Sequence, residues 1–225
     1  AFDVQPSRYM PSASPIESGR GEVEVGGFAG LGVAGTVSVN AAVADRFVIG
    51  ANVSGLYVPV PFTGLALHTY PAFVSARYDL TASDGLNVAP FALIGATYTP
   101  YFYDETYPST GEPRETQAHT DGFTMMGVAI EGGSDKLRFD LSAPLAGLAW
   151  QAELNNRLRF IHAYLMSELG LTWRIEAGHS VRLGTLLAIL PNVAYRRDWA
   201  NMFVEVQGGF VTPLPGVGVS GGIRW

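Results

Sequence analysis

The sequence contains no cysteine among its 225 residues, and charged residues make up only 15% of it. The absence of cysteine excludes a disulfide framework and a thiolate metal site, and it fits an oxidising compartment in which stray thiols are a liability. No run approaches 18 consecutive apolar residues, so the sequence offers no candidate transmembrane helix. The net charge of −6 argues against a nucleic-acid partner, because binding to phosphates requires a basic surface.

Apolar residues, by contrast, are abundant, at 48% of the chain, and 27 glycines accompany 12% aromatic residues. This composition indicates a folded, all-β protein of one domain. Residues 1–20 are rich in Pro and Ser and predict an irregular leader, whereas residues 21–225 predict a single β-domain. The start of the chain lacks the charged and apolar regions of a signal peptide, so we expect such a signal to have been removed.

The hydrophobic pattern from residue 22 onward has a period of two, which is the period of β-strands. In residues 36–41, Thr, Ser and Asn alternate with Val, Val and Ala, and residues 70–78 place Tyr, Ala, Val, Ala and Tyr on one face. The alternation is interrupted at short polar turns around Asp45, Asp84 and Asp135. The chain is therefore predicted to be a series of antiparallel strands.

Period two does not distinguish a membrane barrel from a soluble barrel or sandwich, which packs its apolar face inward. The composition of the polar face distinguishes the two folds better than the period does. This face is rich in Gly, Ser and Thr with isolated charges, and the whole chain has one lysine, Lys136. Surfaces of soluble domains carry roughly 25 to 35% charged residues. We therefore predict a closed antiparallel transmembrane β-barrel, with the soluble fold as the alternative.

The chain ends with Gly-Gly-Ile-Arg-Trp, and its last predicted strand carries an apolar face. That face consists of Val217, Val219, Gly221, Ile223 and Trp225. In this respect residues 21–225 resemble bacterial outer-membrane β-barrel proteins, a class rather than one family. The resemblance implies an assembly signal at Val219, Ile223 and Trp225, although phenylalanine is the commoner terminal residue. It also implies the bacterial outer membrane as location, with the lipid bilayer, lipopolysaccharide and the assembly machinery as partners.

The number of strands must be even if both chain ends are periplasmic. About 205 residues at roughly 17 to 20 per strand and loop allow ten or twelve strands, and we expect ten. The choice depends on Gly30-Leu31-Gly32 and on residues 212–216, each of which is either a turn or a bend within one strand.

The connections of the predicted strands fall into two length classes. The short turns would face the periplasm, and the longer connections near Pro61 and at residues 104–121 would face outward. Several aromatic residues at the base of the longest loop predict a girdle at the lipid headgroups. These are Tyr98, Tyr101, Phe102, Tyr103 and Tyr107.

Charged residues on the face opposite the apolar one are candidates to line the lumen. They are Glu22, Glu24, Arg77, Asp79, Arg138, Asp140, Glu168, Arg174, Arg182, Glu205 and Arg224. In a barrel of eight to ten strands the interior is nearly filled, and opposite charges there pair because an unpaired buried charge is costly. A salt-bridged plug is the expectation, whereas a twelve-strand barrel would leave room for water and a narrow pore.

No residue pattern specifies a reaction. His162 and Glu168 lie roughly 20 Å apart on one extended strand, and Ser167 points to the opposite face, so the three do not form a triad. A set of acidic loop residues fits no recognised cation-binding loop; its members are Asp104, Glu105, Glu112, Glu115, His119 and Asp121. No metal, cofactor or catalytic residue is therefore assigned. We expect a structural or partner-binding barrel of the cell envelope, with a narrow solute pore and a lipid-modifying enzyme as alternatives.

Overall fold

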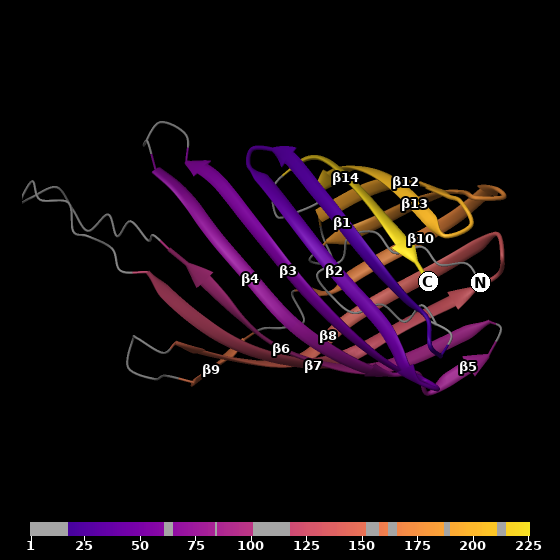
Figure 1. The fold of residues 1–225 in the computed structure, drawn as a ribbon, viewed down its shortest axis with the longest axis horizontal. Coiled ribbons are helices and arrows are strands. Elements are labelled where there is room, and N and C mark those ends of the chain that lie inside the picture. Colours follow the sequence, from indigo (N-terminus) through magenta and orange to yellow (C-terminus); the bar gives the residue numbers. More distant parts are fainter. Residues whose placement is uncertain are drawn as a thin grey trace, which may run out of the picture.

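The computed structural model describes residues 18–60, 65–83, 85–100, 118–151, 158–161, 166–186, 190–210 and 215–225, which form one antiparallel sheet that closes on itself (Figure 1). The strands of the closed ring are β1 (Gly21–Gly30), β2 (Val33–Ala44), β3 (Phe47–Val60), β4 (Leu65–Tyr78), β6 (Leu86–Thr99), β7 (His119–Gly133), β8 (Leu137–Gln151), β10 (Glu168–Glu176), β11 (His179–Leu186), β12 (Leu190–Asp198), β13 (Met202–Phe210) and β14 (Pro215–Arg224).

Two pairings close the ring. β1 pairs with β14, so the two ends of the described chain meet at one seam, and the first half of β8 pairs with β10. The second half of β8 pairs instead with the short strand β9 (Leu158–Ile161), while β5 (Thr81–Ser83) pairs with β6. β9 and β10 thus occupy one position in the wall, beside different halves of β8. The predicted fold class, a closed antiparallel β-barrel, is confirmed.

The ring contains twelve strands rather than the expected ten, so the larger of the two predicted counts is the correct one. The segment Gly30-Leu31-Gly32 is a turn, because β1 and β2 pair antiparallel on either side of it and the Gly30 N–H donates to the Gly32 carbonyl. β13 and β14 also pair antiparallel up to Phe210 and Pro215. The chain therefore reverses between these two residues as well.

Side chains alternate between an exposed apolar face and a buried polar face. Val53 and Trp173 are 59% and 64% exposed, whereas Arg196 and Glu205 are 1% and 0% exposed. A soluble protein shows the opposite arrangement, because exposed apolar area is unfavourable in water and buried charge is unfavourable without partners. The barrel therefore presents its apolar face to lipid. No helix among the described residues is long and apolar enough to span a membrane.

Exposed aromatic residues lie near both ends of the strands. At one end Tyr70 of β4 stacks on Tyr98 of β6, with ring centroids 6.4 Å apart. At the other end the exposed aromatic residues include Tyr78, Trp173, Trp199 and Trp225. Tyr70 and Tyr78 are separated by roughly 26 Å along β4, at about 3.3 Å per residue, which matches an apolar band tilted across an outer membrane.

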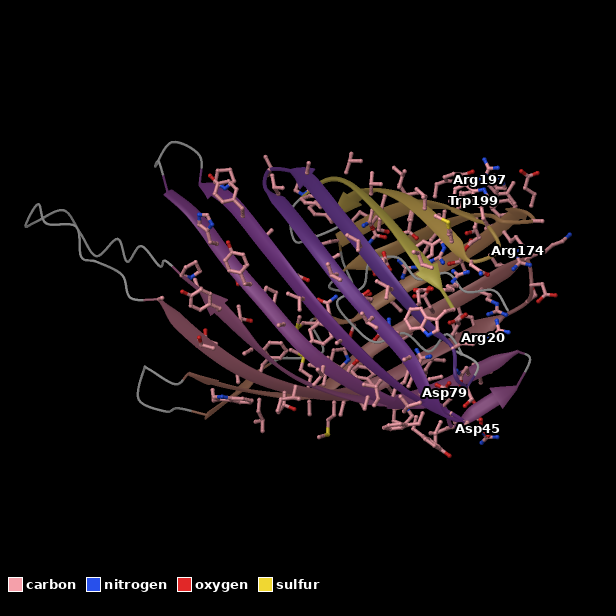
Figure 2. The ribbon with its side chains drawn as sticks, in the orientation of Figure 1. Arg20, Asp45, Asp79, Arg174, Arg197 and Trp199 are labelled. Atoms are coloured by element: carbon pink, nitrogen blue, oxygen red, sulfur yellow. The ribbon has the colours of Figure 1, made fainter. Side chains whose placement is uncertain are left out.

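The two ends of the barrel differ in their connections. Short turns join β2 to β3, β7 to β8, β10 to β11 and β12 to β13, all at the end where β14 finishes. Arg20, Asp45, Arg174 and Trp199 lie at this end (Figure 2). Short turns face the periplasm in barrels of this type, so we expect this end to be periplasmic.

Some predictions fall outside the described residues. They concern residues 1–17 of the leader, the turn residue Asp84, the segment near Pro61, and residues 101–117, which hold four of the five girdle aromatics.

The last three residues before the sheet are described: Gly19 and Arg20 extend the pairing of β1 with β2, because Gly19 N–H donates to the Ala42 carbonyl and Ala42 N–H donates to the Arg20 carbonyl.

Candidate functional site

Charged side chains on the buried face of the ring gather in its periplasmic half. We call this set the charged belt. Its members are Glu22, Glu24, Arg77, Asp79, Glu131, Arg138, Asp140, Glu168, Arg174, Arg182, Arg196, Asp198, Glu205 and Arg224. Except for Glu168, which begins β10, each lies within the part of its strand, or just past the strand end, that is nearest the short turns. Six arginines and seven carboxylates thus lie at the same end of the barrel, Glu168 stands farther along the wall opposite Ser142, and the set contains no lysine.

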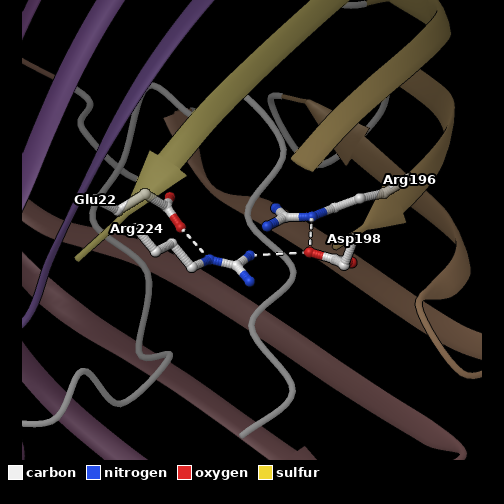
Figure 3. Close-up of polar contacts among 4 residues, drawn as sticks. All are labelled: Glu22, Arg196, Asp198 and Arg224. Carbon is white, nitrogen blue, oxygen red and sulfur yellow. Dashed lines mark hydrogen bonds and ion pairs between the residues drawn. The ribbon is translucent and has the colours of Figure 1, made fainter. Parts of the chain in front are cut away.

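A chain of ion pairs crosses the seam at which the barrel closes (Figure 3). Arg224 of β14 donates from Nε to Glu22 of β1 over 2.9 Å and from Nη2 to Asp198 over 3.1 Å. Arg196 of β12 donates to the same Asp198 oxygen over 3.1 Å. These contacts tie the first and last strands of the barrel to β12, two strands away from the seam on the β14 side.

An aromatic ring completes this network. The Arg196 guanidinium carbon lies 3.7 Å from the centroid of the Phe203 ring, and that of Arg224 lies 5.3 Å from it. Phe203 is buried, so both cation–π contacts are shielded from bulk water and are stronger than exposed ones. Across the β12–β13 pair, Arg196 stands directly opposite Glu205. The belt is therefore densely packed on this side of the barrel.

The second strong ion pair joins β8 and β11 across the intervening β10. Arg182 donates from Nε to Asp140 Oδ1 over 3.2 Å and from Nη2 to Oδ2 over 2.8 Å, a bidentate contact. The guanidinium passes over Gly170, which pairs with Asp140. The absence of a side chain at Gly170 is what allows the long reach of Arg182.

Replacing Gly170 by alanine is expected to lower the stability of the barrel by about 1–3 kcal/mol, because the displaced ion pair leaves buried polar atoms without partners. A Cβ at this position would lie 2.3 Å from Nη2 of Arg182. Urea unfolding in lipid vesicles, followed by tryptophan fluorescence, measures the change. Gly208→Ala is the matched control, since nothing lies within 4 Å of its Cβ position. Equal effects of the two substitutions would contradict the role of Gly170.

Two carboxylates of the belt stand directly opposite each other, Glu131 on β7 and Asp140 on β8. Such a like-charge pair is destabilising unless each member has its own cation. Arg138 donates to Glu131 over 2.9 Å, and Arg182 serves Asp140. Glu168 and Glu205 also act electrostatically on Arg182. The alternation of signs around the ring thus makes the close approach of these carboxylates tolerable.

The belt ends at Asp79, just past the periplasmic end of β4. Its Oδ1 lies 3.4 Å from Nε of Arg77. Burial raises the pKa of the Asp79 carboxyl, and the Arg77 guanidinium and a hydrogen bond from Asn87 partly oppose this shift. Because the pKa is raised in spite of these two contributions, desolvation is the largest influence on this carboxyl.

The structure buries eight of the eleven residues predicted to line the lumen and leaves Arg138, Arg174 and Arg224 half-buried. Glu131, Arg196 and Asp198 also belong to the belt but were not among the predicted residues. The alternation of Val193 and Tyr195 as exposed residues places 194, 196 and 198 on the buried face, and this signal could have found the last two.

Of the weighed catalytic residues, Glu168 is buried in the belt and Ser167 precedes it, whereas His162 lies outside the described residues. Of the weighed loop residues, only His119 and Asp121 are described, at the start of β7. Across the described ranges, no group of three or more His, Asp or Glu residues is arranged to hold a metal ion.

The closed ring, the apolar exterior and the buried charges define a transmembrane β-barrel of the bacterial outer membrane. The fold is similar to that of the KdgM porin, with a TM-score of 0.54 and 10% identity over 91% of this chain and 98% of that one. It is equally similar to an outer-membrane channel from Pseudomonas putida F1, with a TM-score of 0.55 and 10% identity over 99% and 100% of the two chains. No protein-family model and no curated protein sequence matches this chain.

Proposed function

We propose that the barrel is a narrow channel for small solutes, with the charged belt lining the lumen as its constriction. The supporting observation is the contrast between the two halves of the ring. In the periplasmic half most residues of the belt are buried. Toward the extracellular end, residues of the same face, such as Thr36, Ser54 and Phe123, are half-exposed and therefore reached by water. A wet vestibule that narrows at a ring of charges is the arrangement of a selective pore.

The width of the barrel also supports a channel. Side chains fill a ring of about eight strands, and rings of 16 to 18 strands leave an open aqueous channel. Twelve strands lie between these limits. The long arginine side chains of the belt narrow such a ring without the need for a separate domain. The two similar structures include a protein named as a porin and one named as a channel.

Single-channel recording in planar bilayers tests this function. The purified barrel is expected to give small, steady conductance steps, and Arg224→Ala is expected to enlarge them and to increase the preference for cations. The reason is that Arg224 is a half-buried cation that bridges Glu22 and Asp198. Lys136→Ala is the control, because Lys136 is an exposed cation in a periplasmic turn. A barrel that inserts but conducts nothing would overturn the channel.

The buried ion pairs favour a second candidate, a barrel closed by its own side chains that holds a partner in the envelope. Opposite charges packed at this depth seal a ring if no gap remains between them. The same recordings separate the two candidates, since a structural barrel gives no conductance steps in either the unmodified protein or the Lys136→Ala variant.

A further inference from the structure

One section of the wall differs from the charged belt in having no charge at all. β2 and β3 contain no Asp, Glu, Lys, Arg or His over their 12 and 14 residues. On the non-apolar face of these strands and of the adjacent β4 lie six neutral polar side chains, which we call the neutral shelf. They are Thr36, Ser38, Asn40, Asn52, Ser54 and Ser75. Five are half-buried and Asn52 is buried.

Hydrogen bonds hold three residues of the shelf, Thr36, Asn52 and Ser54, in a fixed arrangement. The Asn52 amide donates to Thr36 Oγ1 over 3.2 Å, and the Ser54 hydroxyl donates to Asn52 Oδ1 over 2.8 Å. The side chains come from two strands and are neighbours in register, since Thr36 pairs with Ser54 and Ser38 pairs with Asn52. Donors and acceptors of the shelf are therefore preorganised before a ligand arrives.

Two other residues of the shelf, Asn40 and Ser75, converge over Gly50. A Cβ on Gly50 would lie 2.6 Å from both Asn40 Oδ1 and Ser75 Oγ, so these two oxygens occupy the space above Gly50. Gly50 pairs with Asn40 on one side and with Ser75 on the other. Three adjacent strands thus present amide and hydroxyl groups to one small region.

An apolar wall adjoins the shelf. Phe73 of β4 stands directly opposite Asn52, and it packs against a buried cluster that includes Phe91, Leu93 and Met125. A half-exposed aromatic ring beside a row of neutral hydrogen-bonding groups suits a ligand with hydroxyls on its edge and an apolar face. A pyranose ring has both features.

The charges nearest the shelf favour a neutral ligand over an acidic one. On the β1 side, Glu24 and Glu22 stand opposite Ser38 and Asn40, and Glu22 is paired with Arg224. On the β4 side, the next residue of the buried face is Arg77, which is already paired with Asp79. An acidic sugar would therefore meet the like charge of Glu24 along one border of the shelf.

We propose that the neutral shelf and Phe73 bind the ring of a neutral sugar. The inference deepens the proposed channel, on which it rests for a route by which the sugar arrives. The shelf accepts and donates hydrogen bonds to the ring hydroxyls, and Phe73 covers the C–H face of the ring.

Saturation-transfer NMR on the detergent-solubilised barrel tests the proposal with methyl β-glucoside and methyl β-glucuronide as probes. The glucoside is expected to bind, and the glucuronide to bind at least about fivefold more weakly, as the loss of one favourable polar contact implies. Asn52→Ala and Phe73→Leu are each expected to weaken glucoside binding by about the same factor. Asn192→Ala is the control, because Asn192 is a half-buried amide on β12, outside the shelf.

The outcomes separate the two proposals. Equal binding of the two probes, or no loss of binding in either shelf variant, overturns the sugar site. Glucoside binding in a barrel that gives no conductance steps overturns the channel and leaves the site intact. Conductance steps without glucoside binding overturn the site and leave the channel intact.

Discussion

Replacing Arg196 by alanine is expected to lower the free energy of unfolding by about 3–5 kcal/mol, the cost of breaking a buried ion pair by removing one partner. Arg196 is 1% exposed, donates to Asp198 and stands opposite Glu205, which is 0% exposed. Without the guanidinium, Asp198 loses one of its two arginine partners, Glu205 loses the cation that stands opposite it, and Phe203 loses its closest cation–π contact. Urea titration of the barrel in vesicles gives the change in stability.

Arg197→Ala is the matched control for this experiment. The residue is adjacent in sequence and has the same side chain, but it lies on the exposed face, where its guanidinium carbon lies 5.2 Å from the centroid of the Trp199 ring. Its loss is expected to cost about 0.5–1 kcal/mol. Adding Glu205→Gln to Arg196→Ala should recover part of the lost stability, because the buried carboxylate that stood opposite Arg196 no longer carries a charge. A loss equal to that of Arg197→Ala would show that the belt does not stabilise the barrel.

The alternation of side chains was readable from the sequence because a strand has a strict period of two. Val37 and Val39 face one way and Ser38 and Asn40 the other, and local sequence alone settles this. The same rule placed the charges of the predicted strands opposite the apolar face. Arg196 and Asp198 follow the same rule, since they alternate with Val193 and Tyr195, but they were not among the predicted residues.

The choice between the two predicted strand counts, ten and twelve, depended on turns that lack a strong sequence signal. Asn-Gly and Asp-Gly mark tight hairpins, but the reversal after β1 uses Leu31-Gly32, which also fits a kink in one long strand. Whether this segment is a turn or a kink depends on strand pairing at the seam, where Ala29 pairs with both Val33 and Val217. Such pairing involves residues at opposite ends of the chain.

The ion-pair partner of each belt residue could not be predicted from local sequence either, because the two partners lie far apart along the chain. Arg182 and Asp140 are 42 positions apart, and Arg224 and Glu22 are 202 apart. Which arginine meets which carboxylate depends on register and on the glycine that lets Arg182 pass over β10. The sequence indicated a charged interior, but not the chain of contacts through Asp198.

Replacing Val53 by arginine is expected to destabilise the barrel by about 2–4 kcal/mol, the cost of a cation at the midplane of a bilayer. Val53 lies at the middle of β3 and is 59% exposed on the apolar face, so the charge would enter the centre of the lipid. Tyr78→Arg is the control, because Tyr78 is equally part of the apolar face but ends β4 at the periplasmic girdle, where the expected cost is about 0–1 kcal/mol. Both are measured by urea unfolding in vesicles. Because a soluble barrel would tolerate arginine at either exposed position, equal and small effects would contradict a lipid-facing exterior, whereas a depth-dependent cost follows only if the apolar face contacts the bilayer.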